Sequence, residues 1–242
     1  MRLDKCMELA KIGSRKQVKK LFKAQQIRID GQPAVSLNQI VDPGLQEIIV
    51  DDQQVDIQGS SYFLLHKPAG VVSAVSDKGH QTVLDLIKPE DRVDGLYPVG
   101  RLDRDTEGLL LITNNGPLGF RMLHPKHHMD KVYDVEVNGL LGADAPAFFA
   151  KGVTFLDGTS CQPADVTVLE TSLEHSRAVI RIGEGKFHQV KKMFLAYGVK
   201  LAYLKRTSFG PFQLGDLPVG TYRNLNEAEA QDLKTYFREE EQ

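Results

Sequence analysis

The sequence contains no tryptophan and only two cysteines, Cys6 and Cys161. Two thiols can build neither a multiple-disulfide scaffold nor a four-thiolate zinc site. No apolar run approaches the roughly 18 residues that a membrane-spanning helix needs. The N-terminus leads into mixed polar sequence and has no hydrophobic signal core. We therefore expect a cytoplasmic protein without a membrane partner.

A strong excess of charge of either sign is also missing, because 30 Lys and Arg oppose 32 Asp and Glu for a net charge of −2. That total argues against a polyanionic partner, but binding is local and the segments differ. Residues 1–28 contain nine basic and two acidic side chains. Residues 29–59 contain six acids and no Lys or Arg, whereas residues 186–206 are basic and contain no acid. The neutral total thus conceals two basic segments.

The first basic segment predicts two short helices. Leu3, Met7 and Ala10 have helical spacing, and Ser14 followed by Gln17 has the pattern of an N-terminal capping box. On the second helix, basic side chains fill one arc opposite an apolar face with no acid between them: Arg15, Lys16, Lys19, Lys20 and Lys23. A solvated charged face is the alternative, but such a face normally mixes signs. We therefore favour a face that binds nucleic acid.

A short strand and hairpin turn are expected next, at Ile27-Arg28-Ile29-Asp30-Gly31. Together with Arg2-Leu3-Asp4-Lys5 and Ser14-Arg15, this order resembles the small RNA-binding module first described in a ribosomal small-subunit protein. The resemblance implies that residues 1–58 form an RNA-binding domain. Arg2 and the five basic residues of the second helix would be its RNA contacts.

The rest of the chain predicts an α+β domain over residues 62–238, after a linker at 59–61 and before an acidic tail at 239–242. Helical patterns interrupt the strand candidates irregularly, so we expect a mainly antiparallel or mixed sheet flanked by helices and no repeated parallel βαβ units. The strand candidates are 62–65, 71–74, 109–113, 131–137, 166–169 and 177–182.

Several familiar cofactor patterns do not apply. Gly183-Glu184-Gly185-Lys186 lacks the spacing of a phosphate-binding loop, so no nucleotide cofactor is expected. His124, His127 and His128 lie close together, but no second ligand pair at metal spacing supports them. We predict no metal site.

One glycine-bounded loop concentrates charged residues directly before an apolar strand. It reads Gly100-Arg101-Leu102-Asp103-Arg104-Asp105-Thr106-Glu107-Gly108. Loops at strand ends often carry reactive groups. The residues alone leave open a turn in which Asp103 and Asp105 cap backbone amides and the arginines neutralise them.

This loop resembles the signature loop of pseudouridine synthases. Three further segments match in the family's order: His66-Lys67-Pro68-Ala69-Gly70, Lys131-Val132-Tyr133 and Gly185-Lys186-Phe187-His188-Gln189-Val190-Lys191. The similarity covers nearly the whole chain and is nearest to the RsuA family, which modifies small-subunit ribosomal RNA. It implies isomerisation of a uridine to pseudouridine in that RNA or in a small-subunit assembly intermediate, by a monomer without a cofactor. The alternatives are the same chemistry on large-subunit RNA and a non-catalytic RNA-binding assembly factor.

The resemblance also implies roles for individual residues. Asp103 would be the catalytic carboxylate, acting at C1′ as a nucleophile or at C2′ as a base. Tyr133 would stack on the uracil, and Arg101 would hold the nucleotide after it flips out of the RNA. For Tyr133 a core aromatic is the alternative.

A helix is expected from near His188 to Gly198, with Lys191 on the flank of its buried stripe and Lys192 nearly opposite. Lys191 would then keep Asp103 ionised, and Lys192 would contact phosphate. In the alternative, both lysines face solvent. Further phosphate contacts are expected at Lys126, Lys205 and Arg206.

Overall fold

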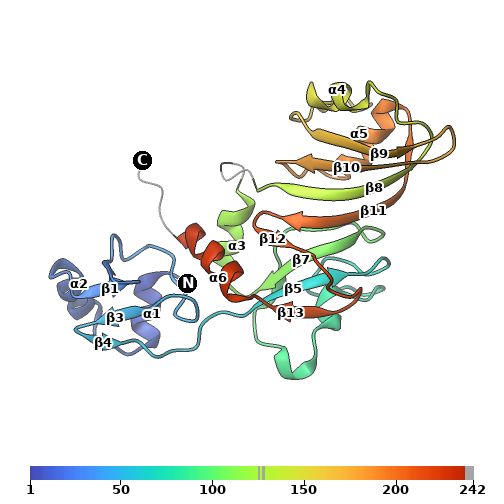
Figure 1. Ribbon diagram of the computed structural model, residues 1–242. Helices are drawn as coiled ribbons and strands as arrows, with labels where there is room; N and C mark the ends of the chain where they lie inside the picture. The colour runs from blue at the N-terminus through green and yellow to red at the C-terminus, as the bar shows by residue number, and fades with distance from the viewer. Residues whose placement is uncertain (125, 127–128, 238–242) are drawn as a thin grey trace.

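The computed structural model describes residues 1–124, 126 and 129–237. His127, His128 and the acidic tail at 239–242 lie outside these residues. Figure 1 shows a small N-terminal unit beside a long mixed sheet, with helices α3 and α6 between the two. No helix in this part of the chain combines the length and the apolar character needed to cross a membrane.

The N-terminal unit packs two helices against a sheet with the strand order β2-β1-β3-β4. The elements are α1 (Leu3–Leu9), α2 (Arg15–Lys23), β1 (Ile27–Ile29), β2 (Gln32–Pro33), β3 (Ile48–Val50) and β4 (Gln53–Gln54). The capping box is confirmed, because the Ser14 side chain accepts from Gln17 N and the Gln17 side chain accepts from Ser14 N. The hairpin turn is confirmed too: β1 pairs with β2, and Asp30 and Gly31 both have positive φ, as a type I′ turn requires.

The large sheet has nine strands, of which seven follow the order β13-β5-β7-β11-β8-β10-β9. β6 pairs with β7, and β12 pairs with β11. The strands are β5 (Tyr62–Lys67), β6 (Tyr97–Pro98), β7 (Glu107–Thr113), β8 (Lys131–Asn138), β9 (Asp165–Thr171), β10 (Ser176–Ile182), β11 (Lys200–Phe209), β12 (Phe212–Gln213) and β13 (Tyr222–Asn224). β7 and β11 run parallel, whereas β5–β7, β8–β11 and β8–β10 are antiparallel. The expected α+β class with a mixed sheet is confirmed.

The strand prediction lacks β6, β11, β12 and β13, and it includes one segment that forms no strand. β11, with ten residues, is central to the sheet but was interpreted only as a basic segment. Residues 71–74 form no strand; Val72 makes a single bridge to Thr82. The Ser73 hydroxyl instead donates to Leu102 O at 2.9 Å and accepts from Leu102 N at 3.1 Å. The segment therefore braces the loop before β7.

The helices of the large unit cover different parts of the sheet. They are α3 (Gly116–Leu123), α4 (Ala145–Ala150), α5 (Gln189–Tyr197) and α6 (Glu227–Lys234), with short 3₁₀ turns at Val83–Leu86, Pro89–Asp91 and Thr235–Phe237. α4 and α5 share an apolar core with β8 and β10, at the end of the sheet away from the N-terminal unit (Figure 1). The helix expected near 188–198 is confirmed, with Gly198 in the left-handed conformation at its C-terminal end.

Asp42 joins the N-terminal unit to the large sheet. It is fully buried and accepts from the Tyr62 hydroxyl at 2.5 Å, from Ser60 N at 3.1 Å and from Asn115 Nδ2 at 3.3 Å. The residues expected to form a linker are therefore held at this point. Gly59 has no room for a side chain here, because a Cβ would lie 2.3 Å from the Gly44 Cα. The limits 1–58 and 62–238 stay predictions about domains, but a buried polar junction connects the two units.

Candidate active site

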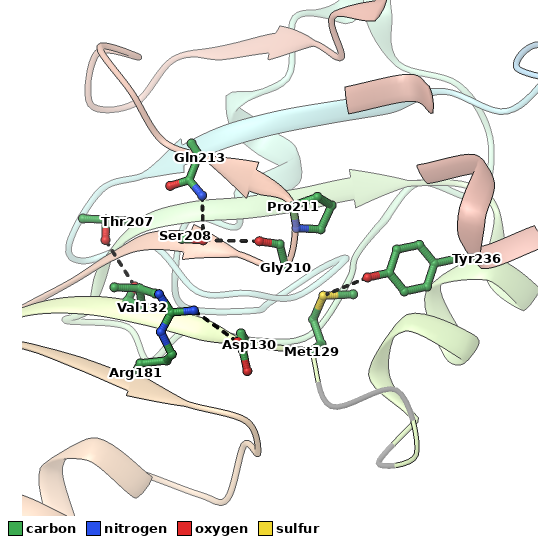
Figure 2. Close-up of a pocket in the computed structure, with 10 residues that line it drawn as sticks. All are labelled: Met129, Asp130, Val132, Arg181, Thr207, Ser208, Gly210, Pro211, Gln213 and Tyr236. Atoms are coloured by element: carbon green, nitrogen blue, oxygen red, sulfur yellow. Dashed lines mark hydrogen bonds and ion pairs between the residues drawn. The ribbon is translucent and has the colours of Figure 1, made fainter. Parts of the chain in front are cut away.

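A cavity of about 830 Å³ lies where the loop before β7, the start of α5 and the strands β8 and β11 meet. Its lining includes Arg101, Asp103, Tyr133 and Lys191, the four residues predicted for the centre of the site. A second cavity, of about 540 Å³, contains none of them. Val132 and Arg181 line it (Figure 2), and these alternate along β8 and β10 with Tyr133 and Ile182 of the first cavity. The two cavities therefore lie on opposite faces of the sheet.

Lys67, at the end of β5, fixes the shape of the loop before β7. Its side chain is fully buried, and Nζ donates to three backbone carbonyls: those of Pro68 at 2.9 Å, Arg104 at 3.1 Å and Thr106 at 2.8 Å. Burial lowers the pKa of Lys67 to about 8. An ammonium group that is buried and donates only to carbonyls cross-links the loop and presents Asp103 at its tip.

Asp103 and Lys191 form an ion pair in the cavity. Lys191 Nζ lies 3.0 Å from Asp103 Oδ2 and 2.6 Å from Asp105 Oδ1. Burial acts to lower the pKa of Lys191, but the two carboxylates outweigh it and raise that pKa overall. The hydrogen bond from Lys191 lowers the pKa of Asp105. The side chains of Asp103 and Lys191 are about one quarter exposed, so both remain within reach of a substrate in the cavity.

His188 is a neighbour of Asp103 that we did not single out from the sequence. Its Nε2 lies 3.5 Å from Asp103 Oδ1, and its ring stacks on Phe187 with centroids 3.8 Å apart. The residue precedes α5 in a left-handed conformation with φ of 53°, which is uncommon for a residue other than glycine. This turn directs both the imidazole and Lys191 toward Asp103.

Tyr133 lies on the buried face of β8 with Val135 and Val137, as the alternation of the strand predicted. It is 7% exposed, yet it lines the cavity. Arg101 is exposed at the rim of the same cavity. The structure therefore brings Tyr133 and Arg101 to the cavity that holds Asp103.

The basic face of α2, defined as Arg15, Lys16, Lys19, Lys20 and Lys23, is exposed throughout, and none of its members lines the cavity. No ion pair neutralises it within the described ranges. Arg2, by contrast, donates to Asp4 at 2.8 Å and to Asn38. Its charge is therefore partly neutralised.

Lys192 and Arg206 have very different surroundings. The Lys192 Nζ lies 2.8 Å from Asp157 and 5.2 Å from the centre of the Phe155 ring, and its contact with phosphate stays a prediction. The Arg206 side chain is not on the surface but in the cavity, at 2% exposure. Lys205, next to it, faces the other way and lies 3.2 Å from Asp134. Leu204, Arg206 and Ser208 lie on the same buried face of β11. Recognising this strand in the sequence would have predicted that Arg206 is buried.

Comparison with known proteins supports the chemistry suggested by this geometry. Residues 61–196 match the family described as RNA pseudouridylate synthase. An uncharacterized RNA pseudouridine synthase of Bacillus subtilis is 41% identical over 230 residues, which is 95% of this chain and 96% of that protein.

Two of the relatives are named for different ribosomal subunits. The ribosomal large subunit pseudouridine synthase B of Bacillus subtilis is 34% identical, with 96% of this chain and 95% of that protein covered. The ribosomal small subunit pseudouridine synthase A of Vibrio vulnificus is 35% identical, with 95% and 97% covered. A crystal structure of a pseudouridylate synthase aligns with a TM-score of 0.66 at 31% identity, over 96% of this chain and 99% of that one.

Proposed function

The chain belongs to the RNA pseudouridylate synthase family, and from this premise we propose that it isomerises a specific uridine of ribosomal RNA, with Asp103 as its catalytic residue. The observation that carries the proposal is the ion pair of 3.0 Å between Lys191 and Asp103, in a cavity that Tyr133 also lines. A carboxylate held beside a cation in a partly enclosed site is suited to act on a sugar carbon or its proton.

The reaction exchanges one bond to the sugar for another. The N1–C1′ bond breaks and its electron pair goes to the uracil. The uracil then turns, C5 bonds to C1′, C5 loses its proton and N1 gains one. Asp103 either forms a temporary bond to C1′, which breaks when C5 bonds there, or takes the C2′ proton and returns it as the C5–C1′ bond forms. On both routes Lys191 supplies a positive charge at hydrogen-bond distance from the carboxylate.

Tyr133 and Arg101 serve the substrate nucleotide in this proposal. A uridine within structured RNA must leave its stack to reach Asp103. Tyr133 presents an aromatic ring from the cavity wall, on which the uracil can stack. Arg101, exposed at the rim, can hold the phosphate or the vacated position of the flipped nucleotide.

The N-terminal unit supplies RNA affinity in this proposal. The basic face of α2 carries five cations that are exposed and unpaired in the described part of the chain. Such a face suits a phosphate backbone, whose charge dominates nucleic-acid affinity. The catalytic cavity then needs to recognise only the target nucleotide and its neighbours.

We place the target in small-subunit ribosomal RNA, on the basis of the motifs quoted above. Large-subunit RNA is the second candidate, because a relative named for that subunit is 34% identical over nearly the whole chain. Pseudouridine mapping on both ribosomal RNAs from a strain that lacks the protein separates the two. Loss of one small-subunit site is expected. Loss of a large-subunit site alone would transfer the assignment, and unchanged pseudouridine in both RNAs would contradict the proposal.

A further inference from the structure

Arg206 is a buried cation without a negative partner. Its side chain is 2% exposed, and no ion pair joins it to a carboxylate anywhere in the described ranges. Its Nη2 is one of three buried side-chain polar atoms there that lack any hydrogen-bond partner. Burying a charge without a partner is energetically unfavourable. A protein that keeps such a group gains by using it with a ligand.

The sheet holds the Arg206 side chain firmly. β11 approaches β7 so closely that a Cβ on Gly108 would lie 2.2 Å from the Arg206 carbonyl oxygen. Arg206 Nε donates to the Leu109 carbonyl at 2.8 Å, and the guanidinium carbon lies 4.8 Å from the centre of the Phe209 ring. Neither contact uses Nη2, which has no hydrogen-bond partner.

The guanidinium faces the catalytic cavity. Arg206 is directly across the strand pair from Tyr133, and both residues line the cavity that holds Asp103. Lys131 lines the same wall, where burial and then the charge of Arg206 lower the pKa of Lys131 to about 8. This wall is therefore positive and has no carboxylate paired with Arg206, whereas Lys191 is already neutralised by Asp103 and Asp105.

We propose that Arg206 is a further catalytic residue whose guanidinium donates to a carbonyl oxygen of the target uracil and stabilises the negative charge that the ring acquires. This inference rests on the proposed function. When the N1–C1′ bond breaks, its electron pair spreads from N1 onto O2 and O4 of the detached uracil. The guanidinium is already desolvated and is oriented by the bond from Nε to the Leu109 carbonyl, and buried, oriented donors lower a barrier most effectively. The charge disappears again when C5 bonds to C1′, C5 releases its proton and N1 takes one up.

A backbone phosphate is a poorer ligand for this group. Arg206 is 2% exposed and lines the cavity, so a ligand can approach its guanidinium only from within the cavity, and Tyr133 on the neighbouring strand provides a ring surface for a flat base. A planar carbonyl acceptor lying on Tyr133 satisfies one donor in that space. We therefore assign the binding of RNA backbone phosphates to the exposed cations and not to Arg206.

The test compares the single-turnover loss of the target nucleoside in two RNAs, one with uridine and one with 5-fluorouridine at the mapped position. Fluorine withdraws electrons and stabilises the uracil anion by itself, so it replaces part of what Arg206 supplies. Arg206→Gln should slow the uridine RNA by about 100-fold and the 5-fluorouridine RNA by clearly less, with unchanged RNA affinity. Arg177→Gln, which removes an exposed arginine from the same sheet, should behave as the wild type.

Arg206→Lys keeps a positive charge in the cavity and guards against misfolding of the glutamine variant. It should show a smaller loss with the same difference between the two RNAs. Equal slowing of both RNAs by the Arg206 variants, or no slowing, would overturn the role in charge stabilisation and leave a structural one. A wild-type protein that converts neither RNA would instead contradict the proposed function, and this inference with it.

Discussion

The cations on α2 and those around the cavity that holds Asp103 carry the same charge in very different surroundings. On α2 all five are exposed, and none of them has an ion-pair partner within the described residues. Around the cavity, Lys67 is fully buried and bonded to carbonyls, Lys191 is paired with two carboxylates, and Arg206 is buried with Nη2 unpartnered. An exposed charge can attract RNA at a distance and adapt to it. An enclosed positive charge is held in one orientation by its protein contacts and can interact with only one ligand group at a time.

The difference shows why net charge describes this protein poorly. The enclosed cations contribute little to long-range attraction, since protein atoms and acids surround them. The exposed face of α2 contributes nothing to the geometry around Asp103. Variants that affect one region and leave the other unchanged are therefore the natural tests, and four follow in order of expected effect.

Asp103→Asn should reduce pseudouridine formation by about 10³-fold or more, because an amide can neither attack C1′ nor accept the C2′ proton. RNA affinity should stay within about twofold, since the basic face of α2 is intact. Tritium release from C5-labelled RNA and filter binding measure the two quantities. Asp165→Asn, an exposed acid on β9, serves as the control. Pseudouridine formation by the Asp103→Asn protein would remove Asp103 from the mechanism.

Lys191→Gln should reduce the rate by about 10²-fold, because it removes the cation 3.0 Å from Asp103. The same change should raise the pKa of Asp105, whose pKa the Lys191 hydrogen bond lowers. Carboxyl chemical shifts followed against pH report that shift. Lys191→Arg should recover part of the activity, and Lys151→Gln should have no effect. If Lys191→Gln were as active as the wild type, the ion pair would be merely structural.

Reversing Lys16, Lys19 and Lys20 to Glu should weaken RNA binding and flatten its dependence on salt. If each lysine neutralises one phosphate, the slope of log affinity against log salt should fall by about two on single-stranded RNA. The single-turnover rate at saturating protein should change little. Reversal of Lys88, Lys151 and Lys200 gives the same change in net charge elsewhere on the surface. Equal slopes for both triple variants would mean that the face of α2 is only solvated.

Tyr62→Phe should have the smallest effect, a loss of about 1 kcal/mol in the free energy of unfolding at pH 7, because Asp42 loses one of its donors. Burial and the neighbouring Asp42 raise the pKa of Tyr62 above its ordinary value of 10.0. Its contribution is therefore fully present below pH 10 and is lost at higher pH, where the unfolded chain releases the proton and the folded chain keeps it. Urea unfolding from pH 7 to 11 should show a gentler alkaline loss in Tyr62→Phe. An unchanged alkaline slope would exclude this linkage.

Sequence patterns were most informative where structure depends on near neighbours. The Ser14–Gln17 capping box, the Asp30-Gly31 turn and the side of α5 that carries Lys191 all follow from residues within a few positions of one another. The sequence also placed Lys191 beside Asp103, and the structure has the two side chains 3.0 Å apart. Its role as the catalytic residue stays a proposal until the substitutions above are made.

Contacts between distant segments were not predictable in this way. Arg206 was interpreted as a surface phosphate contact, because β11 was not recognised and its alternation was therefore not considered. Two of the three carbonyls that Lys67 contacts belong to a loop 37 to 39 residues away along the chain. No local sequence pattern predicts acceptors at such a distance. His188 owes its place near Asp103 to a left-handed backbone turn that the sequence does not signal.

The buried junction at Asp42 has a consequence for target choice. Because Tyr62, Ser60 and Asn115 all donate to this one carboxylate, the segment between the two units cannot act as a free tether. The separation between the basic face of α2 and Asp103 is then fixed by the fold. If RNA binds to that face, a uridine would be selected by its distance from the bound segment as well as by the bases beside it.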